Sequence, residues 1–188
     1  MTLKQISILR FLTESFSEDF SYLLKTDDDI VIDLQAVRRY FEAFFPVHQP
    51  QPTRSIFCAH LNPPAAVIRF VDKYFVSYDE YPAKLFPTYC SGAGYLITKD
   101  LVAELYETSQ HVRTFWIDDI LISGILAKAA GDVKLIQIPR QGLMPLHKLR
   151  DVDGNGVKKM FVHVAQDLLT FELFSKGLQN RRGKNSLS

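Results

Sequence analysis

Three adjacent aspartates, Asp27 to Asp29, stand between two apolar runs in the stretch YLLKTDDDIVID. Adjacent carboxylates repel one another and aspartate is a poor strand former, so these side chains must face either water or a cation. One interpretation is a solvated acidic turn between two strands. The other is a ligand site, because loops at strand ends form the binding edge of open α/β sheets. A calcium loop of the EF-hand type is excluded, because Ile32 stands where that loop needs glycine.

The apolar pattern along the chain predicts helices that alternate with strands, which is typical of an α/β or α+β protein. Asp33 is predicted to cap one helix, and Gly131 to end another. On the helix predicted over residues 99–112, Leu101 and Val112 are expected to share a buried face. The predicted helices cover residues 4–18, 34–45, 99–112 and 116–130, and the predicted strands cover residues 20–24, 30–32, 55–61 and 132–138, with a strand that runs into a helix over residues 158–178.

The composition is that of an ordinary globular chain, with 188 residues of which 47% are hydrophobic and 23% charged. A formal net charge of +1 gives no bulk argument for nucleic acid or an anionic membrane as a partner. The N-terminus carries neither the continuous apolar stretch of a signal peptide nor a membrane span. Cys58 and Cys90 either pair or remain free buried thiols, and two cysteines do not fix the compartment.

A pair of aspartates, Asp118 and Asp119, interrupts the apolar run WIDDILISG. Successive residues on a helix point about 100° apart, so at least one of the two should lie near the buried face. A carboxylate embedded among apolar side chains costs free energy unless it is paired or employed, for example as a general base. The alternative is an aspartate whose oxygens accept hydrogen bonds from backbone amides.

Three further segments carry weaker signals. YCSGAGYL places Gly92 and Gly94 two residues apart, which indicates either turns with positive φ or close approach of the backbone to a ligand. His163 alternates with apolar residues on a predicted strand, where a core histidine is the usual alternative to a metal ligand. DVDGNG, from Asp151, begins like a calcium loop but has Val162 where the bidentate glutamate is required, so we predict a glycine-rich turn.

Taken in order, three segments resemble one family of enzymes. LLKTDDDIVI, YPAKLFPTYCSGAGYLITKDLVAELY and FWIDDILISGILAKAAG are similar in order and spacing to motifs of the β-1,3-galactosyltransferase-like glycosyltransferases. The resemblance covers roughly residues 20–165 and implies an α/β fold of the GT-A type, a Rossmann-like nucleotide-sugar-binding fold. It also implies inverting transfer of a hexose or N-acetylhexosamine from a UDP-sugar to a glycan of a glycoprotein or glycolipid, through a β-1,3 linkage.

The same resemblance implies a metal cofactor, Mn²⁺ or Mg²⁺, and roles for the residues on the donor side. Asp29 would bind the metal, with His163 as a late second ligand. Asp27 and Asp28 would face the ribose or the donor sugar. The backbone of one loop would line the donor-sugar pocket, and its residues are Ser91, Gly92, Ala93 and Gly94.

On the acceptor side, Asp119 matches the family's catalytic aspartate, which takes the proton of the attacking hydroxyl. Asp118 and Ile120 stand where the family has glutamate and valine, and the tryptophan that the family usually shows near Tyr74 is replaced here by other residues. Asp118 is the next candidate for the base if Asp119 points away from the donor aspartates.

The family also has a membrane anchor and further strands ahead of the aspartates, so we expect this chain to lack part of the N-terminal half of the fold. Residues 1–176 would then form a single truncated transferase domain, followed by a disordered polar and basic tail over residues 177–188. A longer form would carry the anchor and lie in the Golgi lumen. The alternatives are a shortened, inactive relative that binds glycan or a partner transferase, and a metal phosphohydrolase.

Overall fold

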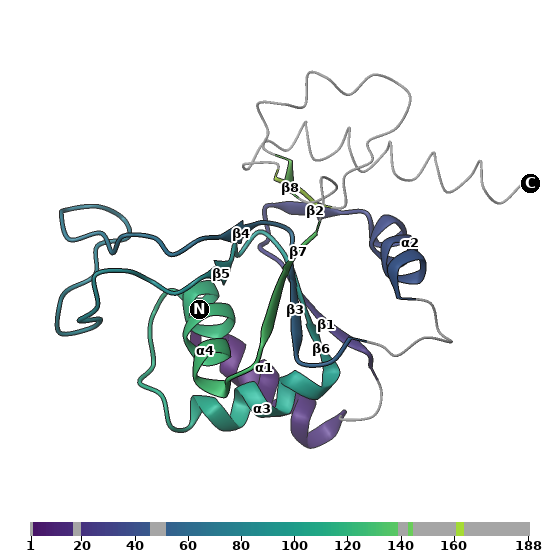
Figure 1. Cartoon of the computed structure of the whole chain (residues 1–188), viewed down its shortest axis with the longest axis horizontal. Coiled ribbons are helices and arrows are strands. Elements are labelled where there is room, and N and C mark those ends of the chain that lie inside the picture. Colours follow the sequence, from purple (N-terminus) through teal and green to yellow (C-terminus); the bar gives the residue numbers. More distant parts are fainter. Residues whose placement is uncertain (1, 17–19, 46–51, 139–142, 145–160, 164–188) are drawn as a thin grey trace, which may run out of the picture.

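The computed structural model describes residues 2–16, 20–45, 52–138, 143–144 and 161–163, and every structural statement below concerns these residues. They form a mixed α/β structure in which helices pack against a mixed sheet (Figure 1). The helices are α1 (Thr2–Ser15), α2 (Leu34–Phe44), α3 (Lys99–Ser109), the π-helix η1 (Ile120–Leu126) and α4 (Ala127–Ala130). The strands are β1 (Tyr22–Lys25), β2 (Ile30–Ile32), β3 (Ser55–Cys58), β4 (Leu61–Asn62), β5 (Tyr89–Cys90), β6 (Tyr95–Thr98), β7 (Lys134–Gln137), β8 (Leu143–Met144) and β9 (Phe161–His163).

The central sheet has four strands in the order β1-β6-β3-β7. β6 pairs antiparallel with both β1 and β3, whereas β3 and β7 are parallel. Because β1 and β6 are neighbours, the segment that follows β1 lies beside the segment that precedes β6. The aspartate triplet and the glycine-containing loop are thereby brought to one end of the sheet.

The two faces of this sheet pack against different elements, because alternate residues of a strand point to opposite faces. Ile56 on β3 and Ile97 on β6 belong to a core shared with α1, α3 and η1. Phe57 and Leu96, the neighbours of these residues, belong to a second core shared with α2 and Phe161. All four residues of β3 are buried, as expected for a central strand covered on both faces.

A second, three-stranded sheet has the order β2-β9-β8 and lies beyond the end of β1. β2 pairs antiparallel with β9, and Ile30 is directly opposite His163. α2 follows β2 and begins at its predicted cap, where the Asp33 carboxylate accepts a hydrogen bond from the amide of Ala36 at 3.0 Å. The pairing therefore places the backbone of His163 beside the chain that leaves the aspartate triplet.

Three predicted helices differ from the observed ones. The helix predicted over residues 4–18 runs from Thr2 to Ser15. The helix predicted over residues 99–112 ends at Ser109, so Val112 lies beyond it, although it still packs against the core. The helix predicted over residues 116–130 is present, but its first part is the π-helix η1, which apolar periodicity over two turns does not distinguish from an α-helix. Gly131 follows α4 with φ of 69°, as predicted for a helix end.

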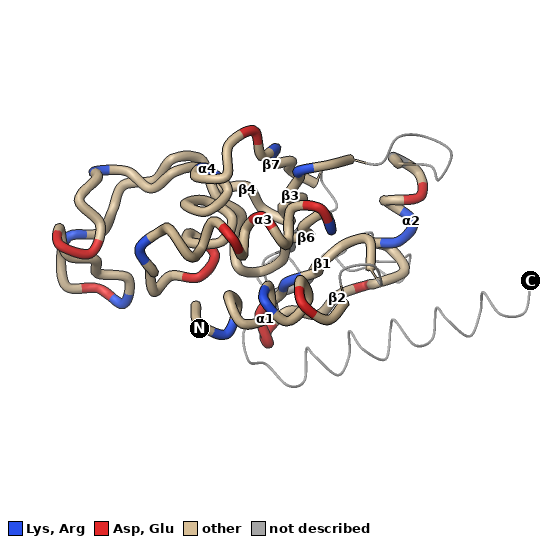
Figure 2. Tube along the Cα trace, turned by 90° about the horizontal axis from the view of Figure 1, so that it is seen from below, with Lys and Arg blue, Asp and Glu red and all other residues tan. Residues whose placement is uncertain are grey.

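A long connection, residues 63–88, runs between β4 and β5 and extends away from the sheet (Figure 1). It carries several exposed large side chains, among them Phe70, Tyr74, Phe75 and Tyr78. Figure 2 shows basic and acidic residues interspersed along the described trace. No helix in the described ranges is long and apolar enough to cross a membrane. The predicted DVDGNG turn and the predicted tail over residues 177–188 lie outside those ranges.

Candidate active site

The aspartate triplet forms a tight turn between β1 and β2. Asp28 and Asp29 are turn residues, and the amide of Ile30 donates to the carbonyl of Asp27 at 3.4 Å. Asp28 is exposed, while Asp27 and Asp29 are half-buried. An acidic turn was one of the two interpretations of the sequence, and it is correct as a description of the backbone. What surrounds the turn decides whether it also forms a site.

Lys25, the last residue of β1, is a buried cation beside this turn, with 8% of its surface exposed. Its Nζ donates to Oδ1 of Asp27 at 2.7 Å and to the carbonyl of Gly92 at 2.9 Å. The same atom lies 3.8 Å from Oδ2 of Asp118. A buried ammonium group is costly unless it is paired and hydrogen-bonded, and these contacts supply both conditions. Lys25 therefore contacts residues from all three sequence motifs.

The loop from Ser91 to Gly94 connects β5 to β6 and faces the triplet. Thr26 donates through its hydroxyl to the carbonyl of Ala93 at 3.0 Å. All four backbone amides of the loop donate within the protein, that of Gly92 to Oδ2 of Asp119 and the others to oxygens of Ser91 and His60. Neither Gly92 nor Gly94 has positive φ, so the prediction of left-handed turns is wrong. Close approach of other groups explains both glycines.

Asp119 is the residue that joins this loop to the first turn of the helical run. Its Oδ2 accepts from the amide of Gly92 at 3.0 Å, and its Oδ1 accepts from the amide of Ile120 at 2.9 Å. Burial raises the pKa of Asp119, and the two amides oppose that shift because they stabilise the carboxylate. Asp118 adds to the rise by repulsion, while Lys25 lowers the pKa by attraction. The interpretation as an aspartate bonded to backbone amides is therefore confirmed, and the role as a general base stays a prediction.

Asp118 directly precedes Asp119, and its carboxylate lies near Lys25. Its side chain is 14% exposed, and its Oδ2 is buried with no hydrogen-bond partner in the described part of the chain. Tyr95 is 1% exposed, and its hydroxyl likewise has no partner there. Burial raises the pKa of Tyr95 well above its ordinary value, with Asp118, Asp119 and Asp27 adding to the rise. Three carboxylates thus act electrostatically on one buried phenol, and the Lys25 ammonium lies 5.7 Å from the centre of its ring.

Asp29 and His163 are the predicted metal ligands. Asp29 immediately precedes Ile30, which pairs directly with His163 across the β2–β9 ladder. Their backbones are therefore neighbours, although the side chain of His163 lies outside the described part of the structure. Within the described residues, no group of three or more acidic, histidine or cysteine side chains could hold a metal ion. A metal held by these two residues would need the remaining ligands from a bound molecule or from solvent.

A disulfide bond between Cys58 on β3 and Cys90 on β5 lies next to the loop of the candidate site. The sequence left pairing and free thiols open, and the structure shows pairing. Ser123 on η1 is fully buried beside this bond. Its hydroxyl accepts from the amide of Cys90 at 2.8 Å and donates to the carbonyl of Asp119 at 2.6 Å. The disulfide and Ser123 therefore fix β5, and with it the start of the loop, against the helical run.

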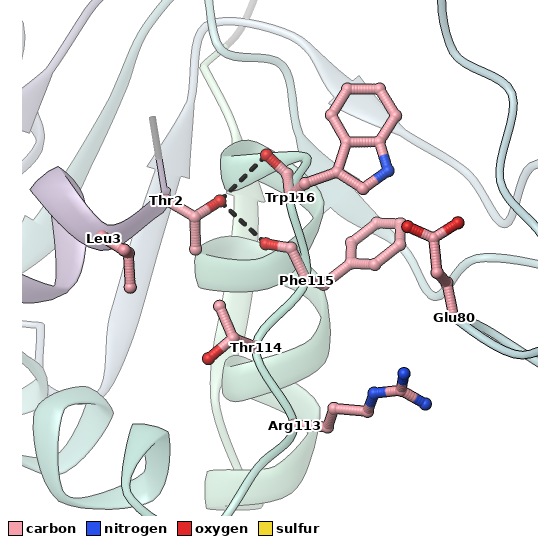
Figure 3. Close-up of a pocket in the computed structure, with 7 residues that line it drawn as sticks. All are labelled: Thr2, Leu3, Glu80, Arg113, Thr114, Phe115 and Trp116. Atoms are coloured by element: carbon pink, nitrogen blue, oxygen red, sulfur yellow. Dashed lines mark hydrogen bonds between the residues drawn. The ribbon is translucent and has the colours of Figure 1, made fainter.

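A pocket of ≈ 350 Å³ lies next to the segment that leads into Asp118 (Figure 3). Thr2 closes one side and donates through Oγ1 to the carbonyls of Phe115 and Trp116, at 2.8 and 2.9 Å. None of the predicted site residues lines it. We therefore place the candidate site where the three motifs meet and not at this pocket.

Sequence reasoning missed two of the residues that organise the site. Lys25 is a lysine at the end of an apolar strand and two residues before the first of three aspartates, which is a signal for a buried ion pair. Ser123 is a hydroxyl inside an otherwise apolar helical run, which is a signal for a buried hydrogen bond. Each signal is present in the sequence, but its partner is defined only by the folded chain.

The protein family of this chain follows from its similarity to a known family model. The family model described as galactosyltransferase matches residues 1–139. The chain belongs to the galactosyltransferase family. The matched range contains the aspartate triplet, the loop and Asp119, but not His163.

Curated relatives in this family are similar to the chain over the same region. "UDP-GalNAc:beta-1,3-N-acetylgalactosaminyltransferase 1" of Sus scrofa and that of Homo sapiens are each 34% identical over 131 residues, which is 65% of this chain and 35% of the relative. "Lactosylceramide 1,3-N-acetyl-beta-D-glucosaminyltransferase B" of Xenopus laevis is 29% identical over 137 residues, which is 71% of this chain and 35% of the relative. The chain thus spans about a third of the length of these relatives.

Proposed function

We propose that this chain carries the donor side and the general base of an inverting, metal-dependent UDP-sugar hexosyltransferase of the GT-A type that forms β-1,3 linkages. One observation carries the proposal: Asp119 is hydrogen-bonded to Gly92, whose carbonyl is bonded to Lys25, which pairs with Asp27. The candidate base Asp119 and the donor-side Asp27 are thereby joined by three hydrogen bonds, which run through Gly92 and the Lys25 ammonium. The names of the relatives, which specify UDP-GalNAc in one case and 1,3-linkages in both, support the reaction class.

On the donor side, Asp27 and the exposed Asp28 would face the ribose or the sugar of the UDP-sugar. Carboxylates accept hydrogen bonds from hydroxyl groups, which both parts of the donor offer. Asp27 is already oriented by Lys25 before any ligand arrives, so less ordering is needed on binding. The backbone amides of the loop from Ser91 to Gly94 already donate hydrogen bonds within the protein. We therefore propose that this loop contacts the donor sugar by van der Waals packing and not through its amides.

Asp29 and His163 fit a divalent metal of the Mn²⁺ type. Their backbones are brought together by the β2–β9 pairing, and a carboxylate with an imidazole is a donor set that suits Mn²⁺ better than Ca²⁺. Mg²⁺ would be bound through the carboxylate and the diphosphate oxygens. When bound, such an ion would neutralise the negative charge that builds on the departing UDP.

On the acceptor side, Asp119 takes the proton of the acceptor hydroxyl while the oxygen of that hydroxyl attacks the anomeric carbon. The new carbon–oxygen bond forms as the bond to the diphosphate breaks, so the configuration inverts in one step. Burial raises the pKa of Asp119, which makes it a stronger base than an exposed aspartate, and the amide of Gly92 fixes its orientation. Burial raises the pKa of Tyr89 and Asp119 adds to the rise, so this phenol lies within electrostatic reach of the base.

The acceptor is proposed to be a glycan of a glycoprotein or a glycolipid, and the compartment the Golgi lumen, with a membrane anchor in a longer form. The disulfide between Cys58 and Cys90 supports an oxidising compartment, because such bonds are rare in the cytosol. The name of the Xenopus laevis relative includes lactosylceramide, a glycolipid, as that protein's acceptor.

The test is a binding and transfer experiment with the chain and with a longer gene product. UDP binding is measured with and without Mn²⁺, and UDP-galactose, UDP-GalNAc and UDP-GlcNAc are then offered with galactose-terminated acceptors. We expect UDP affinity to depend on Mn²⁺ and one donor to give a β-1,3 product. Glycan binding with no UDP binding would support an inactive relative instead. Release of sugar to water faster than to any acceptor would support a hydrolase.

A further inference from the structure

Lys25 is the buried cation of the candidate site, and it contacts more groups than the single carboxylate of a simple ion pair. Its ammonium bonds to Asp27 and to Gly92, lies 3.8 Å from Asp118, and sits 5.7 Å from the centre of the Tyr95 ring. Lys25 and Tyr95 are direct partners in the β1–β6 ladder. The position of the ammonium is therefore fixed by the sheet and not only by its acidic neighbours.

Both backbone polar groups of Gly92 are hydrogen-bonded to residues of the site. Its carbonyl accepts from Lys25 at 2.9 Å, and its amide donates to Asp119 at 3.0 Å. A Cβ atom at this position would lie 2.9 Å from Oδ2 of Asp27 and 3.0 Å from Nζ of Lys25. A Cβ atom here would push aside the ends of the Asp27 and Lys25 side chains, so these two groups pack directly against the residue whose amide binds Asp119.

We propose that Lys25 is a positioning residue for the reaction: it fixes the Gly92 peptide against Asp119 and the Asp27 carboxylate against the donor, and so sets the separation of base and donor. This inference deepens the proposed function and rests on it. Lys25 touches no reacting atom in this assignment. It acts through Gly92 on one side and through Asp27 on the other.

The charge of Lys25 has a second role, because the carboxylates near it repel one another. Asp27 and Asp118 share this one ammonium, and Oδ2 of Asp118 has no hydrogen-bond partner among the described residues. The titratable groups that act on Asp119 are Asp118 and Lys25, and Asp119 in turn acts on Tyr89 and Tyr95. Lys25 is the only cation in that set, so neutralising it leaves the repulsion unopposed.

The test uses carboxyl and amide NMR on this chain and on Lys25→Gln, which keeps a hydrogen-bond donor but removes the charge. Asp119 is assigned through the signal that Asp119→Asn removes. In Lys25→Gln we expect the titration midpoint of the Asp119 carboxyl to rise by at least ~0.5 pH unit. We also expect the Gly92 amide signal to shift less as Asp119 titrates. Lys128→Gln, on an exposed lysine of α4, is the matched control and should change neither signal.

Transfer by a longer form adds the kinetic readout. We expect Lys25→Gln to lower kcat at least ~10-fold with a smaller change in the donor KM, and Lys25→Arg to recover the Asp119 midpoint. Identical Asp119 and Gly92 titrations in Lys25→Gln and the unmutated chain would overturn the inference. If Lys25→Gln does not fold, Lys25→Met replaces it, because methionine is also unbranched but has neither charge nor N–H donor, and unchanged Asp119 and Gly92 titrations there are the overturning result. If the unmutated form transfers no sugar, the proposed function fails, while the NMR titrations still decide the role of Lys25.

Discussion

Gly94 and Phe161 are in contact so close that the first must be a glycine: a Cβ atom at position 94 would lie 2.5 Å from two carbons of the Phe161 ring. Phe161 is fully buried and begins β9, the strand that ends at His163. The loop that faces the aspartate triplet therefore supports the strand that carries the proposed metal-binding histidine. Loop and metal site are expected to respond together when this contact is altered.

The variant Gly94→Ala tests this dependence. The added methyl group must displace the Phe161 ring, because a contact of 2.5 Å is impossible, and overpacking of this kind costs about 1–3 kcal/mol of stability. We expect lower stability in urea unfolding and weaker Mn²⁺-dependent UDP binding. The double variant Gly94→Ala/Phe161→Leu supplies the control, since the smaller side chain leaves room for the methyl group. If Gly94→Ala binds UDP and Mn²⁺ as the unmutated chain does, β9 is not coupled to the loop.

The variant Asp29→Ala should abolish the Mn²⁺ dependence of UDP binding, because it removes one of few protein ligands proposed for the metal. UDP binding measured by calorimetry, with and without Mn²⁺, provides the test. Asp33→Ala is the matched control: it removes the hydrogen bond to the amide of Ala36 and should cost about 1 kcal/mol of stability while the metal dependence remains. Equal UDP affinity with and without Mn²⁺ in the unmutated chain would contradict the proposed metal role.

The disulfide between Cys58 and Cys90 closes a loop with a sequence separation of 32. The double variant Cys58→Ala/Cys90→Ala should therefore lose about 3 kcal/mol of unfolding free energy, mainly because the unfolded chain gains conformational freedom. Urea unfolding measures this loss. A reducing agent should destabilise the unmutated chain by a similar amount and leave the double variant unchanged. Insensitivity of the unmutated chain to reduction would show that the bond contributes nothing to its stability.

Local features of the structure were predictable because their causes lie within a few residues in the sequence. The cap at Asp33 and the end of a helix at Gly131 are examples, and both are confirmed. The contact between Gly92 and Asp119 was not predictable, because it depends on the order of strands in the sheet and on the docking of η1. The role of Lys25 was overlooked for the same reason: its position after an apolar strand is visible in the sequence, but its contacts with Gly92 and Asp118 exist only in the folded chain.

The pH dependence of transfer should reveal the raised pKa of Asp119. The carboxyl is buried, so its pKa lies above the ordinary value of 3.8, and the deprotonated form that accepts a proton is lost as the pH falls through this raised pKa. Because the folded state holds this proton more tightly than the unfolded state, the stability contributed by this group also decreases as the pH rises through the same range. A pH profile of kcat in a transferring form measures the acidic limb. A midpoint at or below 3.8 would contradict the assignment.

The variant Asp119→Asn tests the mechanism itself. The amide side chain keeps the size of aspartate and can still accept from the backbone amide of Gly92, but it cannot take a proton from an acceptor hydroxyl. In a form long enough to transfer sugar, we expect turnover to fall at least ~10²-fold while UDP and Mn²⁺ binding persist, which is the scale of a lost general base.

The matched control for this variant is Asp132→Asn. Asp132 is exposed and has φ of 47°, a conformation that asparagine tolerates, so this exchange should leave both turnover and binding unchanged. The residual activity of Asp119→Asn should lack the acidic limb of the pH profile, because the group that titrates there is gone. Transfer by Asp119→Asn at the unmutated rate would place the base elsewhere. Asp118 would then be tested next, because its Oδ2 is buried near Lys25 and has no hydrogen-bond partner among the described residues.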